Sequence, residues 1–417
     1  MNKIFYRAMM ATLLAGGSVA AVSALAPAVQ AAEEELVAED AIDTEEFSRA
    51  FRRLYSDAVE AFQEDMDIPA AHGVLAEARA DEDLALGERY TLEALDFQLF
   101  LQEGNLEAAT VAFNAAYDTG IMPQADKVKF MRIATILNQS DHPRAIMYGL
   151  EGQNYPGWDA PADQVLVNAF YFSGDLAGAE QQAQNVIARK EVAGETPTFD
   201  ILNVLYFSQS EQGKEAEAAL TADRIAVIQP TPENWERVIT NAFTAPNLQE
   251  RHYLNLYRLR HKVTEMQAAD YKYIVEAAAQ LGLPAEAKVI FEEAISKGLL
   301  QEGDVGISLA DIDALVAETE ASLDAFGAEA AAATTGQEEV QYGELLFSYG
   351  RAADAEAAIQ RGIQKGGLTN PTDAQLMLGI VQLEQGKKVE ARQSFEQAEQ
   401  DAVMRPVAHA WNLYSQI

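Results

Sequence analysis

Small residues recur at a fixed spacing along this chain, and the recurrence limits the folds that it can adopt. The stretch LGIVQLEQGKKVEARQSFEQA, residues 378–398, carries Gly386, Ala391 and Ala398 inside an otherwise helix-forming segment. Residues 342–362 repeat this arrangement 36 positions earlier. A period of this size is typical of arrays of helical hairpins. The sequence therefore predicts repeated helix pairs.

An alanine marks the second helix of each expected pair. The intervals between successive marker alanines are 38, 36, 34, 39, 69, 68 and 36 residues. The two long intervals are each about twice a short one, so we expect degraded units between the clean ones and about ten units in all. The markers are Ala71, Ala109, Ala145, Ala179, Ala218, Ala287, Ala355 and Ala391.

A glycine stands five residues before most of these alanines. Glycine adopts a left-handed backbone without steric cost, so it can end the first helix of a pair. The alanine then lies where the second helix crosses the first, and a larger side chain would force the helices apart. We therefore predict an all-α solenoid of antiparallel helix pairs. The six glycines are Gly104, Gly174, Gly213, Gly282, Gly350 and Gly386.

This pattern resembles the tetratricopeptide repeat family over about residues 45–417. The family's early tryptophan is mostly missing, so related helical-hairpin arrays stay open. The resemblance implies a right-handed superhelix with about ten helix pairs, whose concave face is lined by first helices and binds peptides or proteins. The residues that carry it are Leu378, Gly379, Ala391, Phe395 and Ala398, with Pro230 at the family's closing proline in one unit.

Some members of that family hold the terminal carboxylate of a peptide with lysine and asparagine on successive first helices. Asn168 and Asn203 fall on first helices of adjacent expected units, but no lysine accompanies them in the sequence. They are candidate partner-binding residues, and ordinary polar residues of a groove are the alternative.

The N-terminus reads as a secretory signal. Lys3 and Arg7 precede an apolar run, and Val29-Gln30-Ala31 supplies small residues where a signal peptidase cuts. An uncleaved membrane anchor is the alternative. We expect residues 1–31 to be removed and the mature chain to be exported, most simply to a periplasm, without inserting into a membrane.

The chain is strongly acidic, with a formal net charge of −35. Such a charge disfavours nucleic acid as a partner and favours protein or peptide partners, including cationic ones, although solubility alone also explains it. Eight of the fourteen residues from 33 to 46 are acidic. We predict a disordered acidic leader over residues 32–47.

One segment reverses this charge. Residues 247–263 hold the densest group of basic side chains, together with Tyr253 and Tyr257 near places where small residues are expected. Arg258 and Arg260 make the segment a candidate partner-binding or anion-binding patch with aromatic flanks. The alternative is a helix whose arginines neutralise acidic neighbours.

A second irregular segment is acidic. Between Gly298 and Gly350 there are eleven acidic residues and no lysine or arginine. Apolar residues from 312 to 326 keep a helical period without a glycine turn, so a single docking helix followed by a hinge near residues 328–336 is one interpretation. Calcium binding at Asp311 and Asp313 does not fit an EF-hand spacing.

No motif of an enzyme stands out. There is no cysteine, P-loop, dinucleotide-binding glycine motif or zinc-protease motif. We therefore predict no catalytic residues, no metal and no cofactor. A glycan-processing helical toroid stays open, because some pair of carboxylates will be close in so acidic a chain.

The sequence predicts a solenoid over residues 48–300, a degenerate acidic unit with a hinge over 301–336, and a C-terminal pair of units over 337–417. The leading functional interpretation is a non-catalytic exported scaffold that binds protein partners on its concave face. An accessory of cell-envelope assembly or polysaccharide export is the second interpretation, and the glycan-processing enzyme is the third.

Overall fold

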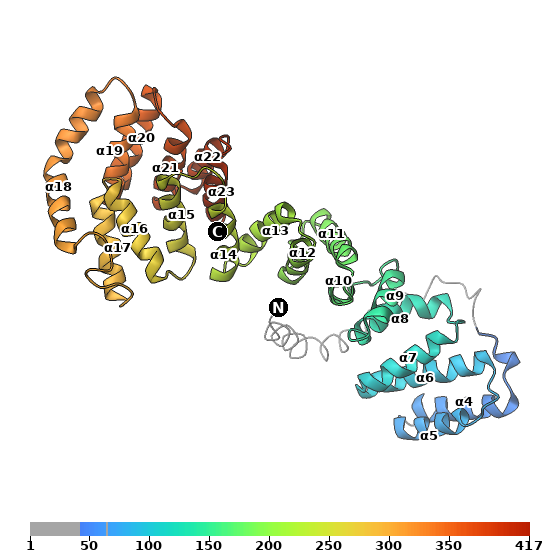
Figure 1. Ribbon diagram of the computed structural model, residues 1–417. Coiled ribbons are helices and arrows are strands. Elements are labelled where there is room, and N and C mark those ends of the chain that lie inside the picture. The colour runs from blue at the N-terminus through green and yellow to red at the C-terminus, as the bar shows by residue number, and fades with distance from the viewer. Residues whose placement is uncertain (1–41, 64–65) are drawn as a thin grey trace. The chain divides into compact units, whose positions relative to one another are not determined.

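The computed structural model describes residues 42–63 and 66–417, and every regular element of this part is a helix (Figure 1). The predicted all-α fold is confirmed. The predicted signal peptide lies outside the described residues, as does the leader up to residue 41. From Ile42 onward the chain is placed, and Phe47 is 4% exposed and packs its ring against Phe51. Ordered structure therefore begins before the expected boundary at residue 48.

Contacts between residues divide the chain into two compact units, and the boundary in the sequence lies between Gln212 and Gly213. This division differs from the boundaries drawn on the sequence, which stay a prediction.

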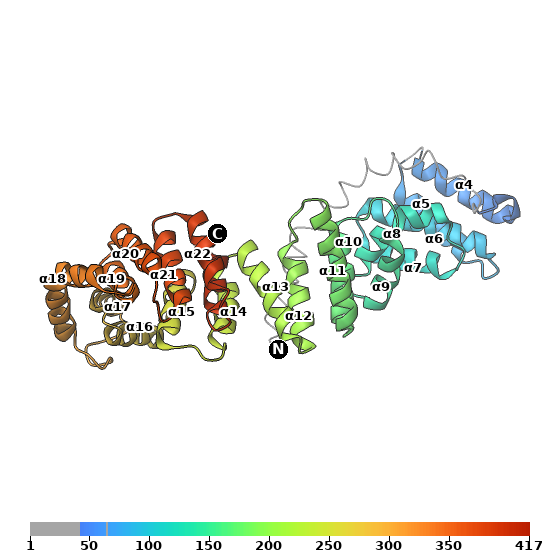
Figure 2. The same ribbon diagram turned by 90° about the horizontal axis from the view of Figure 1, so that it is seen from above.

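Unit 1 consists of helix pairs joined by short turns (Figures 1 and 2). In each of the first four pairs the two consecutive helices pack on one another, and α12 packs on α11 and α10. The first helices α8, α10 and α12 also contact each other in turn. The elements are η1 (Thr44–Glu46), α4 (Arg49–Gln63), α5 (Ile68–Arg79), α6 (Leu86–Glu103), α7 (Leu106–Asp118), α8 (Gln124–Leu137), α9 (His142–Gly152), α10 (Ala160–Phe172), α11 (Leu176–Val192) and α12 (Phe199–Glu211).

Unit 2 continues the pattern with less regularity. The pairs α16–α17, α19–α20 and α21–α22 are each packed together, and α14 lies between α13 and α15. The helices are α13 (Glu215–Ile228), α14 (Pro232–Phe243), α15 (Glu250–Val263), α16 (Ala268–Gln280), α17 (Pro284–Ser296), α18 (Leu309–Ala332), α19 (Gln337–Ser348), α20 (Ala352–Lys365), α21 (Pro371–Glu384), α22 (Lys388–Ala398) and α23 (Arg405–Tyr414).

The two irregular segments fold differently from one another. The first forms the helix pair α14–α15, as the spacing predicts. The second forms the single long helix α18, which contacts α17 and α19. The expected hinge near residues 328–336 stays a prediction; the first part of this range is helical, because α18 continues to Ala332. Its end is held by Lys365, whose ammonium donates to the main-chain oxygen of Ala330 at 3.0 Å.

The glycines and alanines of the repeat occupy the positions that the sequence predicts. All six turn glycines have positive φ, between +72° and +85°. After Gly386 the N–H of Lys387 bonds back to Gln382 at 3.0 Å, which is the closing bond of a glycine-ended helix. The eight marker alanines are at most 3% exposed. The repeat therefore acts through close helix contact.

The first helices also contribute glycines to this contact. A Cβ added at Gly379 would lie 2.5 Å from the ring of Phe395, and one at Gly343 would lie 2.5 Å from Ile359. The ring of Phe395 also stacks on the ring of Trp411 of α23, with centroids 6.3 Å apart. The large residue four positions after the marker alanine thus fills the space that the first-helix glycine leaves.

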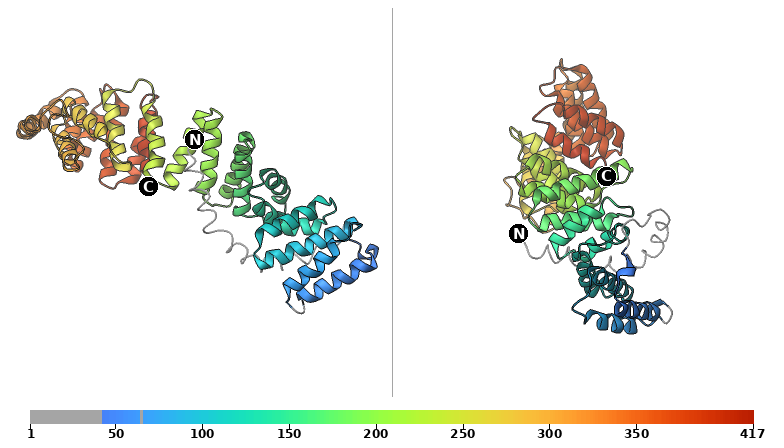
Figure 3. Two further views of the ribbon diagram at one scale, coloured as in Figure 1. Left: turned by 60° about the horizontal axis from the view of Figure 1, so that its bottom comes forward. Right: turned by 90° about the vertical axis from the view of Figure 1, so that its right-hand side faces the viewer.

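The last helix closes unit 2 upon itself, which the sequence did not predict. α23 packs on α22 and also on α13, α14 and α15 (Figure 3). The indole N–H of Trp411 donates to the main-chain oxygen of Asn255 at 3.0 Å. His409 of α23 lies 2.9 Å from a carboxylate oxygen of Asp223 on α13, and Glu399 is its second acidic neighbour.

We predict that Ala355→Leu lowers the free energy of unfolding by about 1–3 kcal/mol, because the larger side chain has no space where α20 crosses α19. Ala357→Leu on the same helix is the matched control, since Ala357 is exposed and its change should stay within about 0.5 kcal/mol. Urea denaturation followed by circular dichroism measures both. Equal midpoints for the two variants would contradict close packing at the marker position.

A second prediction concerns pH. Hydrogen bonds to Asp223 and Glu399 raise the pKa of His409 to about 10. A raised pKa in the folded state means that the stabilisation is complete below the unfolded pKa, about 6.5, and is lost as pH rises through 10. The melting temperature of His409→Gln should therefore differ from that of the wild type most at pH 6 and least near pH 10. His142→Gln is the control; a difference that does not vary with pH would refute the contact.

Candidate partner-binding surface on α15 and its neighbours

Helix α15 carries four of the six residues singled out as candidate partner-binding residues. The helix begins after Gln249, whose main-chain N–H donates to His252 Nδ1 at 3.1 Å. Basic residues in its last turn are favourable beside the negative end of the helix dipole. Its two sides meet different surroundings, one ionic and one aromatic.

Arg258 lies on the ionic side and is 9% exposed. Its guanidinium donates to Glu286 on α17 at 2.7 Å and to Asn255 at 2.7 Å. Burial lowers the pKa of Arg258, but the carboxylates of Glu286 and Glu344 more than offset burial, so the net pKa is raised. Arg258 is therefore held as a cation within unit 2.

The neighbouring Arg251 pairs with Glu344 on α19. Glu344 is 7% exposed, and burial raises the pKa of this carboxyl group against the opposing effect of Arg251 and Arg258. His252 contacts Asp373 on α21 at 3.3 Å. These pairs fasten α15 to helices about a hundred residues further along the chain.

The remaining cations of α15 are engaged in the same way. Arg260 donates to Glu236 at 2.8 Å and lies 3.7 Å from Asp270. His261 and Lys262 have carboxylate partners at 3.0 and 2.9 Å. Each basic side chain of α15 thus has an acidic neighbour in unit 2. The anion-binding interpretation of this segment has no unmatched cation on α15 to support it.

The other side of α15 carries Tyr253 and Tyr257. The ring of Tyr257 stacks on Tyr273 of α16, with centroids 4.4 Å apart, and tilts against Phe243 of α14 at 4.9 Å. Phe243 also stacks on Tyr253 at 6.2 Å. We call these four half-buried rings the aromatic ladder. Sequence reasoning missed Phe243 and Tyr273, because only the packing of α14 and α16 beside α15 brings them together.

Carboxylates border the aromatic ladder. The hydroxyl of Tyr273 donates to Glu250 at 2.9 Å. Burial raises the pKa of Tyr273, and the bond to Glu250 raises it further. Burial also raises the pKa of Tyr257, with a further contribution from Asp270 that Arg260 opposes. Acidic neighbours therefore add to the effect of burial at Tyr257 and Tyr273, and Arg260 opposes it at Tyr257.

Asn168 and Asn203 lie on α10 and α12, which are in contact as the resemblance implies. Both are only 8% exposed. The side-chain oxygen of Asn168 accepts a hydrogen bond from Gln164 at 2.9 Å. Little of either amide is left at the surface, so the structure gives these two residues a place in the packing between first helices.

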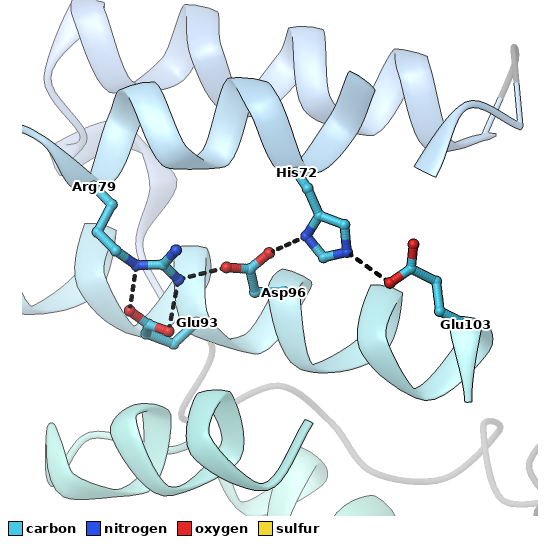
Figure 4. Close-up of polar contacts among 5 residues, drawn as sticks. All are labelled: His72, Arg79, Glu93, Asp96 and Glu103. Carbon is cyan, nitrogen blue, oxygen red and sulfur yellow. Dashed lines mark hydrogen bonds and ion pairs between the residues drawn. The ribbon is translucent and has the colours of Figure 1, made fainter. Parts of the chain in front are cut away.

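A polar network joins the first two helix pairs of unit 1 (Figure 4). Asp96 of α6, whose side chain is 2% exposed, accepts from Arg79 and lies 2.7 Å from His72 Nδ1. The other ring nitrogen of His72 is 3.2 Å from Glu103, and Arg79 also binds Glu93 at 2.9 Å. An Asp–His pair can orient a catalytic base, but here both nitrogens are engaged. The network therefore fastens α5 to α6.

A pocket of about 580 Å³ lies in unit 2, where ends of α14, α15, α21, α22 and α23 meet. The rings of Trp235 and Tyr414 form part of its wall, with centroids 6.0 Å apart. Lys262 and Glu384 at this pocket pair with one another at 2.9 Å. This ion pair and the aromatic wall join α23 to the helices on which it packs.

In the described part of the chain, no group of three or more histidine or acidic side chains is arranged to hold a metal ion. Asp313 is instead paired with Lys288 at 2.6 Å, and Asp311 accepts from Ser308. Among the described helices, none combines the length and apolarity that crossing a bilayer requires.

Comparison with known proteins gives structural likeness only. The sequence matches no protein-family model and no curated protein. A tetratricopeptide repeat protein from Parabacteroides merdae is 12% identical, with a TM-score of 0.26 over 87% of this chain and 99% of that one. The tetratricopeptide domain of P58(IPK) is 14% identical, with a TM-score of 0.23 over 97% and 96%. Naa15/Naa10 bound to HypK is 11% identical, with a TM-score of 0.26 over 84% and 63%.

The class of protein follows from the repeat geometry itself. Glycine-ended first helices and buried marker alanines recur along the array, and in the pairs α19–α20 and α21–α22 a large residue also fills the space at a first-helix glycine. The chain is an all-α helical repeat protein, and the spacing of its small residues resembles that of tetratricopeptide repeats.

We predict that Arg258→Met lowers the free energy of unfolding by about 3–5 kcal/mol, because Glu286 would be left as a buried unpaired charge. Replacing both residues, in Arg258→Met with Glu286→Met, should recover most of the loss. Lys262→Met is the control: its pair is more exposed, so we expect about 0–1 kcal/mol. Denaturant titration of the four proteins measures this, and a double variant no better than Arg258→Met would contradict it.

Proposed function

We propose that this protein is a non-catalytic scaffold that binds protein or peptide partners through the surface of its helical array. The observation that carries the proposal is the division of labour along the chain. The repeated glycines and alanines serve helix ends and helix contacts, and the side chains between them, many of them charged, form the exposed faces. A surface that can vary without loss of the fold suits recognition of other proteins.

The same proposal assigns no catalytic group. A carboxylate-based glycan hydrolase or lyase needs two carboxyl groups about 5–10 Å apart across a cleft. The buried carboxylates described above are bound by cations: Asp96 by Arg79, Glu344 by Arg251 and Glu286 by Arg258. Their partners support a structural role for them.

We further propose that the chain is exported, on the basis of residues 1–31, and acts in a periplasm. A fusion of residues 1–40 to a reporter that is active only outside the cytoplasm tests export. We expect reporter activity from this fusion. The variant Leu13→Arg, which places a charge in the apolar run, should give no activity. A reporter that stays inactive with the intact segment would refute export.

Partner binding is tested with the full chain, tagged and recovered from its own cells after brief cross-linking. We expect the same protein to co-purify in stoichiometric amount with the wild type and with Ala357→Leu. Ala355→Leu, which disturbs the helix contact, should lose it. Absence of any reproducible partner from wild-type samples would contradict the scaffold and leave the array without a proposed role.

A further inference from the structure

We infer that the aromatic ladder binds arginine or lysine side chains of a partner segment. The inference rests on the proposed function and deepens it, because it names one surface and the chemistry of the partner that fits there. It differs from the expectation of an anion-binding patch that the same segment raised at the level of sequence.

The rings offer a preformed contact surface. The four aromatic side chains come from three consecutive helices and touch in the order Tyr253, Phe243, Tyr257 and Tyr273. Each residue is half-buried, so packing limits its motion while part of its surface stays accessible. Rigid aromatic side chains with exposed parts lose little entropy on binding and are enriched where partners bind most strongly.

The charges around the rings determine which partner is favoured. Glu250 is exposed and bonded to the Tyr273 hydroxyl, and Asp270 lies near Tyr257. Arg260 is the cation beside them, and it is already bonded to Glu236. Two carboxylates, the exposed one of Glu250 and the buried one of Asp270, therefore lie beside the aromatic ladder against one cation, so a further negative charge would be repelled.

A cation would gain from both components of this surface. The face of an aromatic ring attracts an ammonium or guanidinium group, and the exposed carboxylate of Glu250 supplies a hydrogen-bond acceptor for the same group. A guanidinium can stack on a ring and bind a carboxylate at its edge at once, so arginine fits better than lysine. A neutral apolar segment would cover the carboxylates without replacing their hydration.

The probe is a short synthetic peptide with two arginines separated by leucine, compared with the same peptide carrying citrulline in place of both arginines. Citrulline keeps the shape and removes the charge. Calorimetric titration of the full chain in 150 mM salt should give a dissociation constant at least about tenfold lower for the arginine peptide. Equal affinities would overturn the inference.

Variants separate the aromatic ladder from the general negative charge of the chain. Tyr257→Leu leaves the charge unchanged and should weaken binding of the arginine peptide about five- to tenfold, whereas Tyr257→Phe should bind as the wild type does. Glu250→Gln should weaken binding about threefold or more. Its matched control is Glu211→Gln, which removes a carboxylate that also accepts from a tyrosine, in unit 1.

The outcomes are distinct for the two proposals. If Tyr257→Leu, folded by circular dichroism, binds the peptide as tightly as the wild type, or if Glu211→Gln weakens binding as much as Glu250→Gln, the aromatic ladder is not the site. If Tyr257→Leu still co-purifies the cellular partner, the scaffold stands and the inference fails. If the wild type recovers no partner, the scaffold fails whatever the peptide does.

Discussion

Close approach of neighbouring helices is the constraint on which the rest of this structure depends. Where Gly379 faces Phe395 and Gly343 faces Ile359, not even a methyl group would fit without displacement. The marker alanines are buried for the same reason, and alanine also favours the helix in which it stands. Each contact orders one pair and presents a surface to the next, so an array forms from local rules without a single central core.

The acidic composition has a structural counterpart in the polar contacts of α15. Its cations bind carboxylates on α17, α19 and α21, and Trp411 bonds to its main chain. Buried ion pairs contribute little net stability, but an unpaired charge in the same place is costly. Such pairs therefore exclude arrangements in which α15 meets the wrong helices, and they favour the closed form of unit 2 over an open array.

The repeat could be predicted because it depends on residues close in sequence. Gly386 lies at the turn that ends α21, and Ala391 lies on α22 where this helix packs on α21. Both roles follow from the spacing of the two residues in the sequence. The packing of α23 on α13, α14 and α15 could not be predicted, because contacts such as that of His409 with Asp223 join residues far apart along the chain. No periodic pattern in the sequence links them. Likewise Tyr253 and Tyr257 were visible as unusual residues, but the partners that complete the aromatic ladder come from the packing of α14 and α16.

The basic segment of α15 shows that a local cluster of arginines can suggest an anion-binding surface where the folded protein exposes none. In a chain of net charge −35, a cluster of arginines in the sequence suggests a surface for anions. The same excess of acid supplies each arginine with a partner inside the fold, and burial of Arg258 strengthens that pairing because water no longer screens it. What stays accessible is the remainder, half-buried aromatic residues bordered by the exposed carboxylate of Glu250. The accessible charge of such a segment therefore depends on which side chains the tertiary contacts remove from the surface, and here they remove the cations.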